Sequence, residues 1–151
     1  MSNYKQPEAT WEQYREGFIP ELTGVKLNEL LVMELPPRGY ILSPWLPIAG
    51  LVLLYAKRGV GKTHFALEIA LTAGSGGEFL SFKAPCPVRV LYIDGEMPAN
   101  AMQERLKKIK ERMIGVENMI DPVFITPDLQ GEFMPDLGTS GGRESIRKFT
   151  E

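Results

Sequence analysis

The chain has 151 residues, enough for one domain with a buried core, and its 44% hydrophobic and 24% charged content is ordinary for a soluble globular protein. A formal net charge of −2 provides no global basic field for nucleic acid, and no apolar run is long enough to span a membrane. The single cysteine and single histidine exclude an internal disulfide and a His/Cys-rich zinc site, and this cysteine usage predicts a cytoplasmic location.

Residues 1–35 are predicted to form a helical extension ahead of the core. A short amphipathic helix is expected first, because three aromatic residues recur at helical spacing, namely Trp11, Tyr14 and Phe18. A second helix is expected from Lys26 to about Glu34, where two prolines end it.

Residues 36–151 are assigned to the core, which begins with a short edge strand at 38–42 and a loop at 43–50. Two roles are open for Tyr40 and Trp45, lining a nucleotide base or packing in the core. Core packing is the preferred interpretation.

An apolar run without polar alternation, Leu51–Tyr55, predicts a strand in a sheet that helices cover on both faces. The segment 56–63 follows with the sequence AKRGVGKT, and a helical pattern runs from His64 to Ala73. Strand, glycine-rich loop and helix in this order indicate a phosphate-binding P-loop, in which Ala56 replaces the usual first glycine. The alternative is an ordinary glycine-rich turn that carries an exposed lysine.

The residue types of this loop suit a nucleoside triphosphate, with ATP as the expected ligand. Gly59 and Gly61 let the backbone curl, so that consecutive N–H groups and the start of the helix can bind phosphate oxygens. Lys62 can reach the terminal phosphates and serve catalysis, and the Thr63 hydroxyl can ligate the Mg²⁺ that bridges them. The expected nucleotide-binding residues are Ala56, Arg58, Gly59, Val60, Gly61, Lys62, Thr63 and His64.

Gly74 is expected to cap the end of the helix that follows the loop, and an irregular connection leads to a second apolar strand, Val88–Ile93. The next helix is predicted from Pro98 to about Met113, with a buried stripe of Met102, Leu106, Ile109 and Met113. Its charged face, which includes Arg105, is interpreted as solvated, with a nucleic-acid contact as the minor alternative.

A third strand is predicted at Pro122–Thr126, and a further helix near Glu144. This alternation of apolar strands and helices predicts an α/β fold with a mainly parallel sheet flanked by helices. Because the carboxyl ends of parallel strands meet at one edge, the P-loop and the segment 94–96 are expected to meet at one ligand site.

Asp94 and Glu96 provide two carboxylates at this edge. A carboxylate there can hold Mg²⁺ through water, orient an attacking water, or cap the following helix. Glu96 lies nearer the loop tip and reaches further, so it is the candidate for orienting water, and Asp94 is a candidate magnesium ligand together with Thr63. The residues alone leave open that both are only helix-start residues favoured by the helix dipole.

Two motifs, 54–63 and the sequence VLYIDGEMP at 90–98, resemble one family, as do three flanking segments at 34–37, 45–47 and 125–130. The chain is similar to the RecA-like ATPases of the RepA hexameric-helicase type, which are AAA-family ATPases of plasmids, phages and integrated elements. The resemblance covers roughly residues 27–140 and implies a P-loop NTPase fold with ATP and Mg²⁺ as ligands. It also implies DNA as a partner, a homo-oligomeric ring, and a water-activating role for Glu96.

The family's Walker B strand, an apolar strand that ends in a magnesium-holding aspartate, has no counterpart after Thr126, because Asp128 and Asp136 lie in a proline-rich loop. We therefore expect the front half of an ATPase core, incomplete at its C-terminal end, whose sheet lacks central strands and exposes apolar surface and unpaired backbone groups. The leading function is ATP hydrolysis that drives work on DNA. The alternatives are a small P-loop kinase and a non-catalytic nucleotide-binding fragment.

Overall fold

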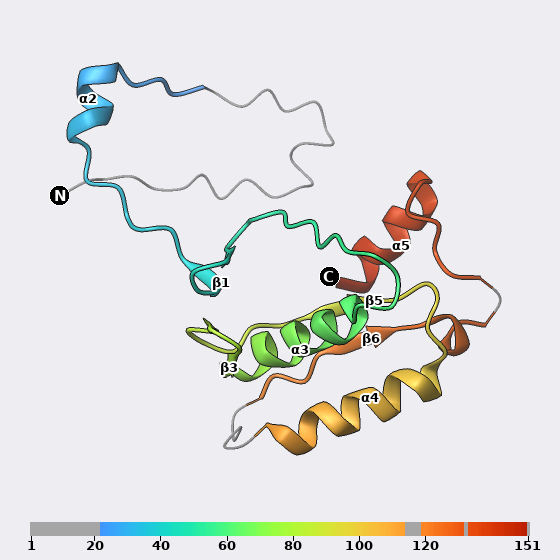
Figure 1. The fold of residues 1–151 in the computed structure, drawn as a ribbon. Helices are drawn as coiled ribbons and strands as arrows, with labels where there is room; N and C mark the ends of the chain where they lie inside the picture. The colour runs from blue at the N-terminus through green and yellow to red at the C-terminus, as the bar shows by residue number, and fades with distance from the viewer. Residues whose placement is uncertain (1–21, 114–118, 132, 151) are drawn as a thin grey trace. The chain divides into compact units, whose positions relative to one another are not determined.

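The structure is a computed structural model that describes residues 22–113, 119–131 and 133–150 (Figure 1). The chain divides into two units, residues 1–37 and 38–151. Each unit is described by itself below. The amphipathic helix predicted near residues 10–18 lies outside the described residues.

The described part of the first unit contains one short helix, α2 (Leu27–Val32). The backbone N–H of Lys26 donates to the Glu29 carboxylate at 3.1 Å, which satisfies one of the otherwise unpaired donors at the helix start. The helix forms where it was predicted but ends two residues earlier than Glu34, and none of its residues is buried.

The second unit contains three two-stranded sheets and three α-helices among its described residues. In chain order the elements are β1 (Tyr40–Leu42), β2 (Leu46–Pro47), α3 (Lys62–Ser75), β3 (Glu78–Phe79), β4 (Phe82–Lys83), β5 (Leu91–Ile93), α4 (Ala99–Arg112), β6 (Val123–Ile125), the 3₁₀-helix η1 (Pro127–Leu129) and α5 (Ser140–Thr150). Within these described ranges, no helix combines the length and the apolar composition needed to cross a bilayer.

β5 and β6 form the parallel pair of the fold, with α4 as the connection between them. Leu91 pairs with Val123 and Ile93 with Ile125, and the N–H of Asp94 extends the ladder by donating to the Ile125 carbonyl at 2.9 Å. The other two pairs, β1–β2 and β3–β4, are antiparallel hairpins. The prediction of a mainly parallel sheet is therefore wrong for the described strands, because only one of their three pairings is parallel.

The apolar run ahead of the P-loop departs furthest from expectation. Leu51–Tyr55 has no regular secondary structure and belongs to no ladder of the described chain, and Leu51, Leu53 and Tyr55 are 99%, 89% and 88% exposed. The predicted buried strand is therefore wrong here. The run has the composition of a central strand, but a strand is held by ladder partners, and no described strand pairs with it.

The core lies between α3, α4 and the β5–β6 pair (Figure 1). Leu67 and Leu71 of α3 meet Met102 and Ile109 of α4, and Met97 joins them from the loop after β5. Each fully buried side chain of this size stabilises the fold by about 1.5–3 kcal/mol. The predicted buried stripe of α4 is confirmed, with Leu106 and Met113 partly buried against the same cluster.

The end of α3 is set by Gly76 rather than by Gly74. Gly76 adopts the left-handed conformation, with φ at 70°, and its N–H donates to the Thr72 carbonyl. Gly74 lies inside the helix and is buried, and a Cβ there would come within 2.7 Å of the Ile120 carbonyl oxygen. The predicted cap is thus two residues early, and Gly74 instead permits the close approach of the segment before β6.

An aromatic cluster joins the two hairpins to the start of α3. Trp45 lies against Phe65 and Phe82, with ring centroids 5.9 and 5.3 Å apart, and Phe65 lies against Phe79 at 5.3 Å. Such separations are typical of favourable aromatic pairs. Trp45 therefore packs as the preferred interpretation expected, and the cluster fixes the first turn of the helix that follows the P-loop.

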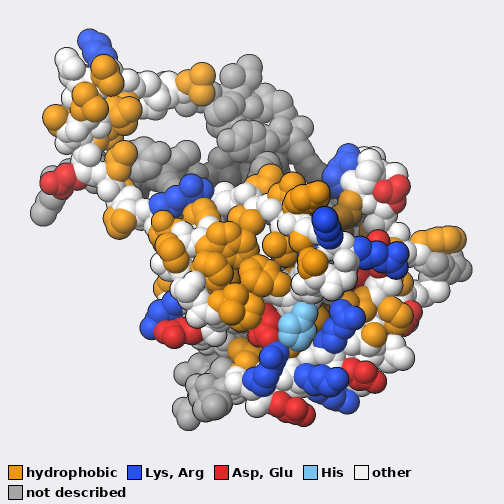
Figure 2. All heavy atoms as spheres, viewed as in Figure 1, with side chains coloured by type: hydrophobic (Ala, Val, Ile, Leu, Met, Phe, Trp, Pro, Cys, Tyr) orange, Lys and Arg blue, Asp and Glu red, His pale blue; other side chains and the backbone are white. Residues whose placement is uncertain are grey.

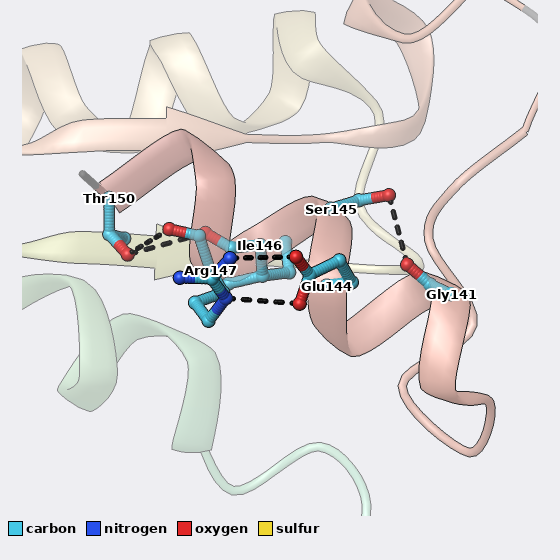
Figure 3. A network of polar contacts seen from close by, with 6 residues as sticks. All are labelled: Gly141, Glu144, Ser145, Ile146, Arg147 and Thr150. Carbon is cyan, nitrogen blue, oxygen red and sulfur yellow. Dashed lines mark hydrogen bonds and ion pairs between the residues drawn. The ribbon is translucent and has the colours of Figure 1, made fainter. Parts of the chain in front are cut away.

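α5 begins four residues earlier than the predicted Glu144, because Thr139 provides a cap. The Thr139 hydroxyl accepts a hydrogen bond from the Gly142 N–H at 3.0 Å. Figure 3 shows the helix surface, where two nitrogens of Arg147 donate to the two carboxylate oxygens of Glu144.

Gly142→Ala is expected to destabilise the chain, because a Cβ at this position would lie only 2.0 Å from the Asp136 carbonyl oxygen. Overpacking of this kind costs about 1–3 kcal/mol of the free energy of unfolding. Gly141→Ala is the matched control, since nothing lies within 4 Å of its Cβ position. It should instead stabilise by up to ~1 kcal/mol. Urea unfolding followed by circular dichroism compares the two, and equal effects would contradict the packing described.

Candidate functional site

A cavity of about 450 Å³ lies between the glycine-rich loop, the start of α3 and the segment that follows β5. We call it the loop cavity, and its wall consists of Arg58, Gly59, Gly61, Lys62, Thr63, His64, Glu96 and Arg105. Its volume falls within the range of about 300–1,000 Å³ that is usual for small-molecule sites. Figure 2 shows one face of the molecule, where Lys and Arg side chains gather with acidic ones beside an area of hydrophobic side chains.

Two glycines set the curvature of the loop. Gly59 and Gly61 have φ angles of 86° and 94°, a region that residues with a Cβ rarely adopt. Gly61 is the N-cap of α3, and its carbonyl accepts from Phe65 at 3.0 Å. The first N–H groups of α3 therefore start at the wall of the loop cavity, and unpaired N–H groups at a helix start attract anions.

Lys62 is folded back over the loop. Its ammonium group donates to the Ala56 carbonyl at 2.8 Å and to the Lys57 carbonyl at 3.0 Å. Ala56 therefore does not line the loop cavity, and its carbonyl instead accepts a hydrogen bond from Lys62. Val60, another predicted nucleotide-binding residue, is 63% exposed and does not line the loop cavity.

The two candidate carboxylates occupy different positions. Asp94 Oδ1 accepts hydrogen bonds from the N–H groups of Glu96 at 2.9 Å and Met97 at 2.7 Å, and Asp94 is not on the wall of the loop cavity. Glu96, in contrast, lines the loop cavity. Asp94 therefore holds the turn that presents Glu96 opposite the glycine-rich loop.

Arg105 on α4 lies on the same wall, although the sequence placed it on a solvated face. It is exposed, and among the described residues no carboxylate lies within ion-pair distance of it. The sequence does show that Arg105 and Arg112 are seven residues apart, so that both lie on one side of α4. This spacing is the one sign that the two arginines could face the same neighbouring element. Three basic residues, Arg58, Lys62 and Arg105, thus line the loop cavity together with one acidic residue, Glu96.

A second polar contact fixes the far end of α4 to α3. Arg112 forms an ion pair with Glu68, and its guanidinium also lies 3.2 Å from His64 Nε2. His64 Nε2 is 3.4 Å from the same Glu68 carboxylate oxygen. His64 therefore lines the loop cavity, and its Nε2 atom also takes part in the contact with Arg112 and Glu68 that joins α3 to α4.

The electrostatic field at the end of β5 affects Tyr92. Burial raises the pKa of Tyr92 above its ordinary value, the nearby Asp94 carboxylate raises it further, and the Arg105 guanidinium opposes them. Two charges from the site region therefore act on one hydroxyl.

The later aspartates have structural partners. Asp128 Oδ2 accepts from the Ala99 N–H at 2.8 Å, and this bond caps the start of α4. Asp136 Oδ1 accepts from the Gly138 N–H at 2.8 Å in the turn before α5. Neither of them lines the loop cavity.

The residues of the loop cavity fit a magnesium nucleotide. Within residues 22–113, 119–131 and 133–150, no three His, Cys, Asp or Glu side chains cluster in a way that could hold a metal ion. Mg²⁺ is usually bound through one or two carboxylates and the phosphates of a substrate rather than in an all-protein cage. Thr63 and Glu96 on the wall suit an ion that arrives with the nucleotide.

A comparison with protein-family models matches residues 18–140 to a family described as AAA domain. The match covers most of the chain and includes every residue of the loop cavity. The chain belongs to the AAA-type P-loop ATPase family. Membership of this family implies that the chain uses a nucleotide. Searches of curated proteins and of solved structures find no match.

Proposed function

We propose that this AAA-family chain binds ATP with Mg²⁺ in the loop cavity and hydrolyses it. One observation carries the proposal: the curled segment 58–64 and the Glu96 carboxylate, from elements far apart in the sequence, line one cavity. Hydrolysis of a terminal phosphate depends mostly on positioning and on charge stabilisation. The loop cavity is lined by basic residues and by one acidic residue, Glu96, which suits both requirements.

The proposed roles follow from the geometry. The N–H groups around Gly59 and Gly61 bind phosphate oxygens, and Lys62 leaves the loop carbonyls to contact the terminal phosphates. The Thr63 hydroxyl ligates Mg²⁺. Glu96 accepts a proton from an attacking water and orients that water toward the terminal phosphate.

The sequence suggested Asp94 as a magnesium ligand, and its hydrogen bonds leave a narrower role. Its Oδ1 is taken by two backbone N–H groups, which leaves Oδ2 for a water of the magnesium shell. We therefore propose that Asp94 acts on the metal only through water, while its first function is to hold the Glu96 turn.

At a finer level, we propose a RecA-like ATPase of the RepA helicase type that acts on DNA as a ring. The resemblance of 54–63 and 90–98 to that family supports this proposal. The exposure of Leu51–Tyr55 also supports it, because an apolar run without described ladder partners suits pairing with one more strand, such as the family's Walker B strand.

The kinase alternative finds less support. A kinase needs mobile arginines that close over the phosphates, and the two arginines of α5 are committed within their own region. Arg143 donates to the carbonyls of Leu137 and Gly138, and Arg147 donates to Glu144 (Figure 3). The non-catalytic alternative is favoured by one observation: Asp128 and Asp136 are occupied with backbone N–H groups.

ATP turnover by the unmodified chain separates the three functions. Binding is measured with a fluorescent ATP analogue in the presence of Mg²⁺, and phosphate release is measured with no acceptor present. The proposal predicts both saturable binding and phosphate release. Turnover only in the presence of an acceptor hydroxyl would identify a kinase. Binding without release at high protein concentration would identify a non-catalytic nucleotide-binding protein, and the absence of binding would refute the proposal.

A further inference from the structure

Arg105 is one of the residues of the loop cavity, with Arg58 and His64, to which the proposed function gives no role. It comes from α4, whereas the other two cations of the wall belong to the glycine-rich loop and the start of α3. Among the described residues it has no carboxylate partner, although Glu96 is on the same wall. A guanidinium that faces a cavity without an ion pair is available to a ligand.

The position of Arg105 relative to the loop indicates which part of a ligand it meets. Two parts of the chain supply the lining of the cavity: the glycine-rich loop with the start of α3, and the stretch after β5 that carries Glu96 and Arg105, which we call its second side. A nucleotide held by the loop through its inner phosphates presents its last phosphate to this second side. Arg105 then joins Lys62 as a cation close to the charge that distinguishes a triphosphate from a diphosphate.

Electrostatics favours a cation at this position. The Glu96 carboxylate and the negative terminal phosphate repel one another when they approach, and a guanidinium between them offsets that repulsion. The influence of Arg105 on the pKa of Tyr92 indicates that its charge acts at the end of β5, where the Glu96 turn begins.

The packing of α4 keeps Arg105 on this side. Arg112, one heptad further along the same face, is tied to Glu68 and His64 of α3. Met102 and Ile109 anchor the neighbouring face of α4 in the core. Rotation of α4 about its axis would break these contacts, so the guanidinium is held near the loop cavity by a rigid element rather than by a loop.

We propose that Arg105 contacts the terminal phosphate of the bound nucleotide and makes the site selective for nucleoside triphosphates over diphosphates. The inference rests on the proposed function, since it requires a nucleotide in the loop cavity. It adds a specificity residue contributed by the same chain, on the wall opposite the glycine-rich loop. An arginine suits this task because its planar donors can form two parallel hydrogen bonds to one phosphate.

The test compares dissociation constants for a non-hydrolysable ATP analogue and for ADP, both with Mg²⁺, in the full chain and in Arg105→Ala. The affinity for the triphosphate is expected to fall about tenfold or more, as for the loss of a charge-assisted hydrogen bond, while the affinity for ADP changes less than about twofold. Arg105→Lys should recover part of the selectivity, because it keeps the charge but not the paired donors.

Arg89→Ala is the matched control. Arg89 is an exposed arginine that lines a different cavity beside Phe149, so its removal changes the net charge equally. Both dissociation constants should stay as in the unmodified chain, and circular dichroism checks that all variants are folded. Equal weakening of the ATP analogue and ADP in Arg105→Ala, or no change in either, would overturn the inference. A chain that binds neither nucleotide would instead refute the proposed function.

Discussion

Lys62→Ala is expected to weaken ATP binding by at least about a hundredfold, because each charge-assisted hydrogen bond contributes about 1.5–3 kcal/mol and the lysine makes several. The change removes a cation from the wall of the loop cavity. It also removes the two hydrogen bonds from the ammonium group to the Ala56 and Lys57 carbonyls, which hold the loop curled. Titration with a fluorescent ATP analogue measures the loss.

Lys57→Ala is the control for this variant. Lys57 belongs to the same loop, but its side chain is not part of the cavity wall, and only its carbonyl contacts Lys62. Its removal lowers the net charge by the same amount and should change ATP affinity by less than about threefold, as for a screened surface charge. Equal losses in the two variants would mean that general charge, rather than the position of Lys62, attracts the nucleotide.

Glu96→Gln is expected to keep ATP binding and to lower the rate of hydrolysis by about a hundredfold or more, which is the usual contribution of a positioned general base. The amide has nearly the same shape but cannot accept the proton of the attacking water. The turn should persist, because it depends on the Glu96 N–H and the Asp94 carboxylate, which the change leaves in place. Phosphate release under saturating ATP measures the effect.

Glu104→Gln provides the comparison for that experiment. Glu104 is an exposed carboxylate on α4 that does not line the loop cavity, so the same chemical change there should leave both binding and turnover unaltered. If Glu96→Gln released phosphate at the unmodified rate, another group would have to activate the water. If it failed to bind ATP, Glu96 would be needed to shape the site.

The features predicted correctly from the sequence are those set by local periodicity. The apolar stripe of α4 was visible because burial repeats at the helical period, and the strands around Leu91 and Val123 were visible because each is a short apolar run. The meeting of the loop with Glu96 was expected from the rule that parallel strands end at one edge, although the run before the loop pairs with no described strand. The structure brings these residues together on one wall.

The features that were missed depend on neighbours that the sequence does not show. Leu51–Tyr55 reads as a central strand, but strand formation needs a ladder partner, and composition cannot reveal whether one is present. The cap at Gly76 and the close approach at Gly74 depend on the segment near Ile120, which is distant in sequence. Arg105 was predicted to be solvated, because the sequence of the charged face of α4 does not show that the glycine-rich loop lies near it.

A crystal structure of the chain with Mg²⁺ and a non-hydrolysable ATP analogue tests the central claim most directly. The account predicts phosphate oxygens within hydrogen-bond distance of the backbone N–H groups of residues 59–63, with the Glu96 carboxylate facing the last phosphate across the loop cavity. Phosphates bound elsewhere on the chain, or a Glu96 carboxylate turned away from them, would contradict it.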